Sequence, residues 1–119
     1  MFDKLEVVEA DVEVRVDVER AVKGATYVVH VASACPYDEP KDEESKAALI
    51  KTALDGCKLV MEAAKKEKVK RVVLTSSIAC VRDFFPKDRL PPGTPYTEEQ
   101  WSDTEFQKLQ ATYKVSKTL

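Results

Sequence analysis

The segment Ala25-Thr-Tyr-Val-Val-His-Val-Ala32 is a continuous run of β-branched, aromatic and small side chains that contains no Asp, Glu, Lys or Arg. Such a run is typical of a strand that is buried on both faces of a parallel sheet. Val69–Ile78, centred on Val72-Val-Leu74, predicts a second buried strand. Two such strands with a helix between them indicate a parallel sheet.

The connection between these strands predicts one long helix over Asp42–Glu67. Its apolar residues recur at steps of three and four, which places them on one face. They are Leu49, Ile50, Ala53, Leu54, Cys57, Val60, Met61 and Ala64. Gly56 costs about 1 kcal/mol relative to alanine in the middle of a helix, so we expect it to lie in close contact with a neighbouring segment.

The segment before the first buried strand is ambiguous. Leu5–Ala10 predicts a strand that ends at Asp11. The next valines alternate with charged residues, as in a half-buried strand. Asp17, however, can cap a short helix that runs through Val22, and Gly24 can close it. We interpret this segment as a loop followed by that short helix.

The segment after the second buried strand predicts a long loop and a final helix. Arg82–Pro95 contains four of the six prolines. In and just after this loop, Phe84, Phe85 and Tyr96 either line a substrate pocket or fasten the loop to the domain. Ser102-Asp-Thr-Glu105 matches a capping box and is expected to open one helix with Phe106, Leu109, Tyr113 and Lys117 on a single stripe.

Strands that alternate with helices predict an α/β fold: a parallel sheet with flanking helices. In such sheets, ligands bind beyond the carboxyl ends of the strands. The residues at those ends are Asp11, Ala32-Ser33 and Thr75-Ser-Ser77, and small or hydroxylated side chains there leave room for a ligand. Taken alone, Ser76 and Ser77 are better explained by ordinary strand-end and turn chemistry than by a ligand site.

Tyr113 and Lys117 stand four residues apart in the final helix, which places the phenol and the ammonium on one face. A cation beside a phenol favours its ionised form, and such a group can pass a proton in either direction. Tyr37 and Lys41 have the same spacing, but Pro40 would break a helix there, so we assign that pair to a loop.

Composition limits the class of protein. The 119 residues make one domain at most, and a net charge of −2 offers no footprint for nucleic acid or an anionic membrane. We expect no signal peptide, no membrane span and a cytosolic location. The three cysteines have no metal-ligand spacing and an odd count, so each is expected to be a buried thiol in a reducing compartment, and we expect no metal.

Five motifs in order resemble those of the extended branch of the short-chain dehydrogenase/reductase superfamily, and within it the dihydroflavonol reductase and cinnamoyl-CoA reductase group of the epimerase/dehydratase families. They are VEADV (8–12), VVHVAS (28–33), VKRVVLTSSIA (69–79), WSD (101–103) and YKVSK (113–117). The match covers nearly the whole chain, and the order and spacing make it specific although each motif alone is weak.

The resemblance implies a role for individual residues. Ser77 matches the residue that hydrogen-bonds the substrate carbonyl, Tyr113 the general acid/base, and Lys117 the residue that assists it and holds the nicotinamide ribose. Further cofactor contacts are implied for Asp11 and Val12 at the adenine and for Ala32, Ser33 and Thr75 along the cofactor. His30 lies inside a strand, and we assign it a structural role.

One departure from the resemblance is large. The three glycines, at 24, 56 and 93, do not form the G-x-x-G-x-x-G turn that holds the pyrophosphate. We therefore expect residues 1–119 to be a partial NAD(P)-binding Rossmann domain, an internal fragment from about the third strand to the catalytic helix, without the first β-α-β unit and the C-terminal substrate lobe. In the strand order 3-2-1-4-5-6, Leu5–Ala10 would then have no partner, and we expect such a piece not to fold stably alone.

For the intact protein, the resemblance implies hydride transfer between NADP or NAD, with NADP preferred, and a small-molecule carbonyl or secondary alcohol. Two alternatives stay open: a Rossmann sensor that binds the cofactor without catalysis, and an inactive truncated reductase. The sequence leaves the substrate and the oligomeric state undetermined.

Overall fold

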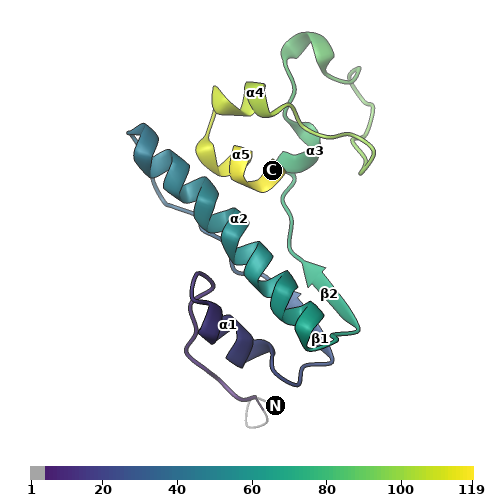
Figure 1. Ribbon diagram of the computed structural model, residues 1–119. Coiled ribbons are helices and arrows are strands. Elements are labelled where there is room, and N and C mark those ends of the chain that lie inside the picture. Colours follow the sequence, from purple (N-terminus) through teal and green to yellow (C-terminus); the bar gives the residue numbers. More distant parts are fainter. Residues whose placement is uncertain (1–4) are drawn as a thin grey trace. The chain divides into compact units, whose positions relative to one another are not determined.

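The computed structural model describes residues 5–119, in which helices and strands alternate as far as α3 and only helical elements follow (Figure 1). In chain order these are α1 (Arg15–Val22), β1 (Tyr27–His30), α2 (Glu43–Lys66), β2 (Arg71–Leu74), α3 (Ala79–Arg82), the 3-10 helix η2 (Pro86–Asp88), α4 (Thr104–Lys108) and α5 (Thr112–Thr118). The described residues divide into two compact units. The first unit comprises residues 5–32 and 55–74, and the second comprises residues 33–54 and 75–119.

The two strands of the first unit pair in parallel, with Tyr27 opposite Arg71 and His30 opposite Leu74. The predicted parallel sheet is thereby confirmed, although each strand is shorter than predicted. The expectation that both faces are buried is wrong: Tyr27, Val29 and Val73 are exposed. Within the described residues, helices pack on one face of this sheet only, so alternate side chains of each strand remain in solvent.

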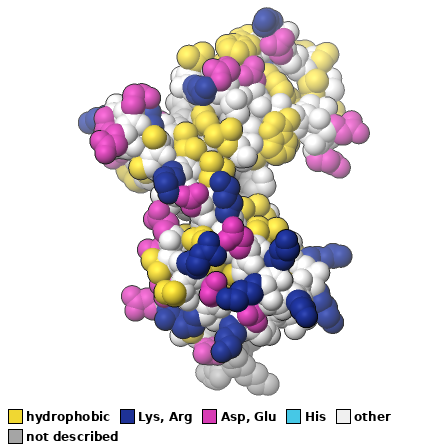
Figure 2. Space-filling model, viewed as in Figure 1, with side chains coloured by type: hydrophobic (Ala, Val, Ile, Leu, Met, Phe, Trp, Pro, Cys, Tyr) yellow, Lys and Arg dark blue, Asp and Glu magenta, His cyan; other side chains and the backbone are white. Residues whose placement is uncertain are grey.

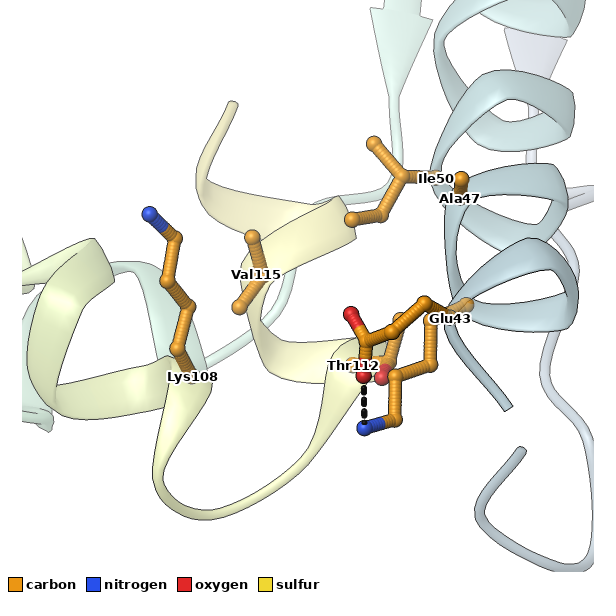
Figure 3. Close-up of a pocket in the computed structure, with 7 residues that line it drawn as sticks. Glu43, Ala47, Ile50, Lys108, Thr112 and Val115 are labelled. Carbon is orange, nitrogen blue, oxygen red and sulfur yellow. Dashed lines mark hydrogen bonds and ion pairs between the residues drawn. The ribbon is translucent and has the colours of Figure 1, made fainter. Parts of the chain in front are cut away.

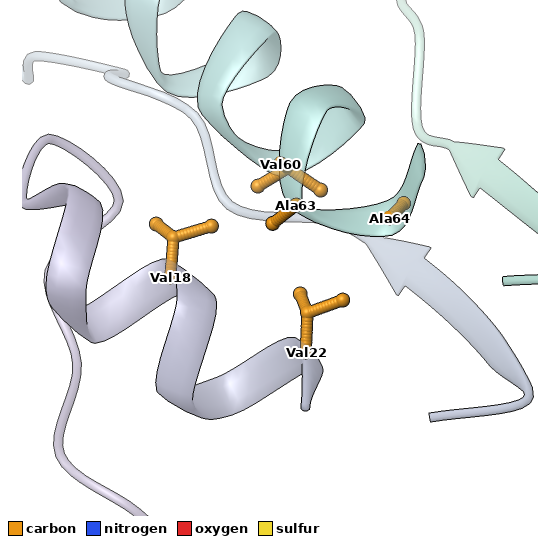
Figure 4. Close-up of a cluster of buried hydrophobic side chains, with 5 residues drawn as sticks. All are labelled: Val18, Val22, Val60, Ala63 and Ala64. Atoms are coloured by element: carbon orange, nitrogen blue, oxygen red, sulfur yellow. The ribbon is translucent and has the colours of Figure 1, made fainter. Parts of the chain in front are cut away.

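The core of the first unit lies between α1 and the second half of α2 (Figure 4). Val18 and Val22 contact a stripe of α2 formed by Val60, Ala63 and Ala64, and half-buried Val28 and Val72 bring the sheet against it. Each buried valine contributes about 1.5–3 kcal/mol to stability. The α2 boundaries agree with the prediction within one residue. The buried stripe is shifted by part of a turn, however, because Gly56 and Ala63 are buried and Met61 is exposed.

The N-terminal segment differs from its prediction. Leu5–Ala10 forms no strand, because none of residues 5–119 offers it a neighbouring strand. The short helix is confirmed, but α1 begins at Arg15, before Asp17. The carboxylate of Asp17 accepts the backbone N–H of Asp11 at 3.2 Å and pairs with Arg20 at 2.8 Å, so it fastens the preceding turn instead of capping the helix. Gly24 closes α1 at φ 72°.

The predicted final helix is two helices, which corrects the single stripe from Phe106 to Lys117. The N-cap of α4 is Asp103, whose Oδ1 accepts the backbone N–H groups of Glu105 at 2.8 Å and Phe106 at 3.2 Å. Ser102, the expected cap, is buried, and its hydroxyl instead accepts the N–H of Asp83 at 2.9 Å. The chain turns after Lys108, and α5 begins at Thr112.

The exposed basic residues, the cysteines and the length of the helices test what the composition predicted. Lys and Arg side chains gather over the first unit in Figure 2, where Lys65, Lys66, Lys68, Lys70 and Arg71 are exposed at and beyond the end of α2. All three cysteines are free thiols, but only Cys80 is buried, and the expectation of burial is wrong for exposed Cys35. No helix within residues 5–119 has both the length and the apolarity needed to cross a membrane.

Gly56 provides a test of the core. A β-carbon added at Gly56 would lie 3.4 Å from Cγ2 of Val12, which confirms the expected close contact but leaves room for a methyl group. We predict that Gly56→Ala raises the free energy of unfolding by about 0.5–1 kcal/mol, because alanine loses less backbone entropy in a helix. Urea denaturation measures the change.

The matched control is Gly24→Ala, since a side chain at φ 72° is strained even though the space around it is open. We expect that variant to lose about 1 kcal/mol. A lower midpoint for Gly56→Ala than for the parent chain would show that Val12 cannot accommodate the methyl group.

Candidate active site

Tyr113 and Lys117 lie on one face of α5, as the spacing predicts. The ammonium of Lys117 is 5.6 Å from the centroid of the Tyr113 ring, within the range of a cation–π contact. Both side chains are half-buried, and the ammonium forms no ion pair within residues 5–119. Its three donors therefore remain available for a ligand beside the phenol.

Ser77 lies in the second unit, three residues beyond β2 and two residues before α3. Its hydroxyl accepts the backbone N–H of Ala79 at 3.2 Å, which leaves the hydroxyl proton free to donate. Nothing described in the chain links Ser77 to Tyr113 by a hydrogen bond. The two groups lie on separate elements, Ser77 before α3 and Tyr113 in α5.

A buried thiol joins the element that follows Ser77 to the helix that carries Tyr113. The Sγ of Cys80 in α3 donates to the backbone carbonyl of Lys117 at 2.8 Å. The same sulfur lies 3.3 Å from the hydroxyl of Ser76, and the residue is only 2% exposed. Cys80 therefore fixes the last turn of α5 against the segment that follows β2.

The other end of α5 is held by a carboxylate from the loop after β1. Glu39 Oε1 accepts the backbone N–H of Thr112 at 2.8 Å and also its hydroxyl. The hydrogen bond from the Thr112 hydroxyl has the largest effect and the one from the amide the next largest, and together they hold the pKa of Glu39 below its ordinary value of 4.5. An anion at this position also suits the positive end of the helix. The loop after β1 and the Tyr113 helix are thus fastened together.

A buried polar cluster supports α3 from α4 and the segment before it. The carbonyl of Ala79 accepts Nε2 of Gln107 at 2.8 Å and the hydroxyl of Ser102. Gln107 is fully buried, and its Oε1 has no hydrogen-bond partner. Asp83, also buried, pairs with Lys114 of α5 at 3.2 Å. These bonds connect α3, α4 and α5 into one small assembly.

The remaining residues expected at a cofactor follow the strands or lie in the N-terminal segment. Ser33, half-buried, and Thr75, exposed, belong to the second unit with Ser77, Tyr113 and Lys117. Asp11, Val12 and Ala32 belong to the first unit. Val12 contacts Gly56, and the carboxylate of Asp11 accepts the N–H of Glu13 at 2.8 Å, so both have local structural roles. His30 is buried inside β1, in keeping with a structural role.

Among the described residues of the second unit, two pockets lie near these helices without being lined by Ser77, Tyr113 or Lys117. The first, of about 290 Å³, lies between the first half of α2 and the helices α4 and α5, with Ile50 facing Val115 and an ion pair of 2.7 Å between Glu43 and Lys46 at its edge (Figure 3). The second, of about 350 Å³, is lined by Arg82, Asp83, Arg89, Tyr96, Gln110 and Lys114.

The aromatic residues of the long loop pack against protein. Phe84 stacks on Tyr96 with ring centroids 6.0 Å apart, and Phe85 contacts Phe106 of α4 at 5.1 Å. These contacts favour the fastening role over the substrate-lining one for both phenylalanines. Tyr37 is fully exposed in a loop, as expected for the pair with the misleading spacing.

Three residues that shape the site had no local signal in the sequence. Glu39 acts on a partner 73 positions away. Cys80 and Gln107 act on backbone carbonyls, which any residue supplies. Pairs of this kind cannot be read from spacing or composition.

Comparison with known proteins identifies the family of the chain. A sequence profile described as NAD(P)H-binding matches residues 2–115. Tetraketide alpha-pyrone reductase 2 of Arabidopsis thaliana is 33% identical over 98% of this chain and 36% of its own length. Dihydroflavonol 4-reductase of Medicago sativa is 36% identical over 98% of this chain and 52% of its own. Cinnamoyl-CoA reductase 1 of Arabidopsis thaliana is 34% identical over 89% of this chain and 28% of its own length.

The fold is similar to that of solved reductases. Vestitone reductase from alfalfa matches 98% of this chain and 34% of its own, with a TM-score of 0.66 and 25% identity. The α/β architecture and the reductase resemblance are thereby confirmed. The chain spans between about a third and a half of the length of most of these relatives.

Glu39 predicts a pH dependence. Because its pKa is lowered in the folded state, its contribution to stability is complete above 4.5 and is lost as the pH falls through the lower folded value. We expect Glu39→Gln to be less stable than the parent near neutral pH and to lose less stability below pH 4.5. Urea unfolding at a series of pH values, with hydrogen exchange at the Thr112 amide, measures both effects.

Glu98→Gln, in an exposed turn, is the control. Asp42, whose pKa is lowered by the amide and hydroxyl of Ser45, is unchanged in both variants, so the difference isolates Glu39. Identical pH profiles for Glu39→Gln and the parent would mean that the Thr112 bonds do not anchor α5.

Proposed function

The chain belongs to the NAD(P)H-binding family, and from this premise we propose that it carries the acid/base residues of an NAD(P)-dependent reductase that converts a small-molecule carbonyl to an alcohol. When bound, the nicotinamide supplies or accepts the hydride. The observation that carries the proposal is the Lys117 ammonium, which forms no ion pair within residues 5–119 and is held beside the Tyr113 ring.

Tyr113 would pass its phenolic proton to the carbonyl oxygen as negative charge develops there. Ser77 would donate its free hydroxyl proton to the same oxygen and so orient and polarise the carbonyl. Lys117 would stabilise the phenolate left on Tyr113 and donate to the ribose hydroxyls. In the direction of oxidation, the phenolate would take the proton back.

The chain's own residues fit such a cofactor at the strand ends. The small side chains of Ser33 and Thr75, both in the second unit, are in segments that follow strands, and such positions let a ligand approach the backbone. The names of the relatives, all reductases, favour hydride chemistry on a carbonyl. We propose NADP in preference to NAD, and a small organic molecule as substrate.

A second candidate is binding of the cofactor without catalysis. It is favoured by the position of the Ser77 hydroxyl, which accepts the N–H of Ala79 and makes no hydrogen bond with Tyr113 within residues 5–119. A sensor, however, would have no need for the proton-transfer set, so turnover by point variants distinguishes the two.

In the protein that carries this chain, Tyr113→Phe should lower kcat about 10²–10⁴-fold and leave the affinity for NADPH nearly unchanged, because only the proton is lost. Lys117→Ala should lower both kcat and the affinity for NADPH, because the ammonium also holds the ribose. Steady-state kinetics with fluorescence titration of NADPH measures both quantities.

Tyr37→Phe and Lys41→Ala form the matched control, since this pair repeats the spacing in a loop. Neither should change activity. Retention of more than about 1% of kcat by Tyr113→Phe would remove this residue as the general acid.

The 119 residues contain no G-x-x-G-x-x-G turn, and helix N-termini after such turns bind the most charged part of the cofactor. We therefore expect isothermal titration of this chain with NADPH and with NADH to show no low-micromolar site. A one-site isotherm in that range, from a monomer that melts cooperatively, would show that another part of the chain replaces the pyrophosphate site.

A further inference from the structure

The pocket of about 350 Å³ between α3, α5 and the long loop carries an excess of positive charge. Three cations line it, Arg82, Arg89 and Lys114, against one carboxylate, Asp83. Asp83 pairs with Lys114 at 3.2 Å, which compensates that ammonium. The guanidinium groups of Arg82 and Arg89 form no ion pair with any described residue. Two cationic forks therefore line one hollow without a counter-charge.

Two of the lining side chains, Arg89 and Tyr96, are held by aromatic contacts. The guanidinium carbon of Arg89 lies 5.9 Å from the Phe106 centroid, and Phe106 is itself packed on Phe85. Tyr96 stacks on Phe84 with nearly parallel rings. Such fixed side chains lose less conformational entropy on binding than free ones do.

Neutral donors complete the set. The side-chain oxygen of Gln110 accepts the ammonium of Lys114, so its NH₂ group remains available to donate. The Tyr96 hydroxyl makes no hydrogen bond with other residues of the 5–119 range. Guanidinium forks with amide and hydroxyl donors form the set that recognises a planar oxyanion in two-point contact.

We propose that this pocket binds the carboxylate of a small organic acid. Phosphate offers the same oxygen chemistry, but the Asp83 carboxylate in the lining opposes a dianion more strongly than a monoanion. The volume lies at the lower end of the range for ligand sites, which suits the end group of a larger molecule.

The position of the pocket connects it to the substrate. Arg82 ends the short helix that follows Ser77, and Lys114 is the residue after Tyr113 in α5. If the reductase function holds, on which this step rests, the acid bound here is the carbonyl substrate itself. Its carboxylate end lies in this pocket and its carbonyl reaches the Tyr113 face of the same helix.

The test is a titration of the ¹⁵N-labelled protein that carries this chain, observed by NMR at low ionic strength, with benzoate, with neutral benzamide and with inorganic phosphate. We expect benzoate to shift the amides of Arg82, Arg89 and Lys114 and benzamide to leave them unchanged. Each charge-assisted bond contributes about 1.5 kcal/mol, so Arg82→Gln and Arg89→Gln should each weaken benzoate about tenfold. Arg82→Lys keeps the charge but loses the two-pronged guanidinium. Its affinity for benzoate should lie between those of the parent and of Arg82→Gln.

Lys87→Gln, an exposed neighbour outside the pocket, is the control and should bind as the parent does. Equal shifts with benzamide, or benzoate affinity unchanged in both arginine variants, would overturn the site. Tighter binding of phosphate than of benzoate would overturn the carboxylate assignment.

A second measurement separates this inference from the proposed function. In the protein that carries this chain, Arg82→Gln should lower kcat/KM about tenfold for 4-carboxybenzaldehyde and leave it unchanged for 4-formylbenzamide. Equal losses for both substrates would overturn the link to the substrate. No turnover of either aldehyde by the parent, with benzoate binding intact, would overturn the reductase function and leave the pocket as a carboxylate site alone.

Discussion

A helix of seven residues cannot hold itself together in water, because nucleation costs more than so few hydrogen bonds return. The helix α5 nevertheless carries Tyr113 and Lys117, so its order depends on bonds at its two ends. The carboxylate of Glu39 accepts hydrogen bonds from the amide and the hydroxyl of Thr112. The thiol of Cys80 donates a hydrogen bond to the carbonyl of Lys117. One anchor comes from the loop after β1 and the other from the helix after β2. The acid/base pair is thereby positioned by the two segments in which a parallel sheet places its ligands.

The anchors also explain why the chain breaks between α4 and α5. The amide of Thr112 turns to the Glu39 carboxylate instead of continuing the helix that ends at Lys108. In an unbroken helix Phe106 and Tyr113, seven residues apart, would face the same way. The break separates their tasks: Phe106 contacts Phe85 and Arg89, while Tyr113 faces the ammonium of Lys117.

Features encoded locally could be predicted from the sequence. Continuous apolar runs predict the two parallel strands. Helical spacing over a few turns predicts the long α2 and the shared face of Tyr113 and Lys117. Features that depend on a distant partner could not. Leu5–Ala10 has strand composition but no strand beside it among the described residues, and strand structure requires that neighbour. Ser102 matches a capping motif, but its hydroxyl accepts a hydrogen bond from the buried amide of Asp83. Asp103 therefore caps α4 instead.

Asp83 shows how one buried charge shapes the chemistry around it. Removing a carboxylate from water is costly unless a cation and hydrogen bonds replace the solvent. Lys114 supplies the cation and Gln107 approaches the same oxygen at 3.5 Å. That pairing uses the only ammonium of the pocket and leaves the two arginines uncompensated. The burial of Asp83 therefore fixes α3 against α5. As a consequence, the positive charge that remains free in the lining of this pocket is guanidinium, the group whose geometry matches an oxyanion.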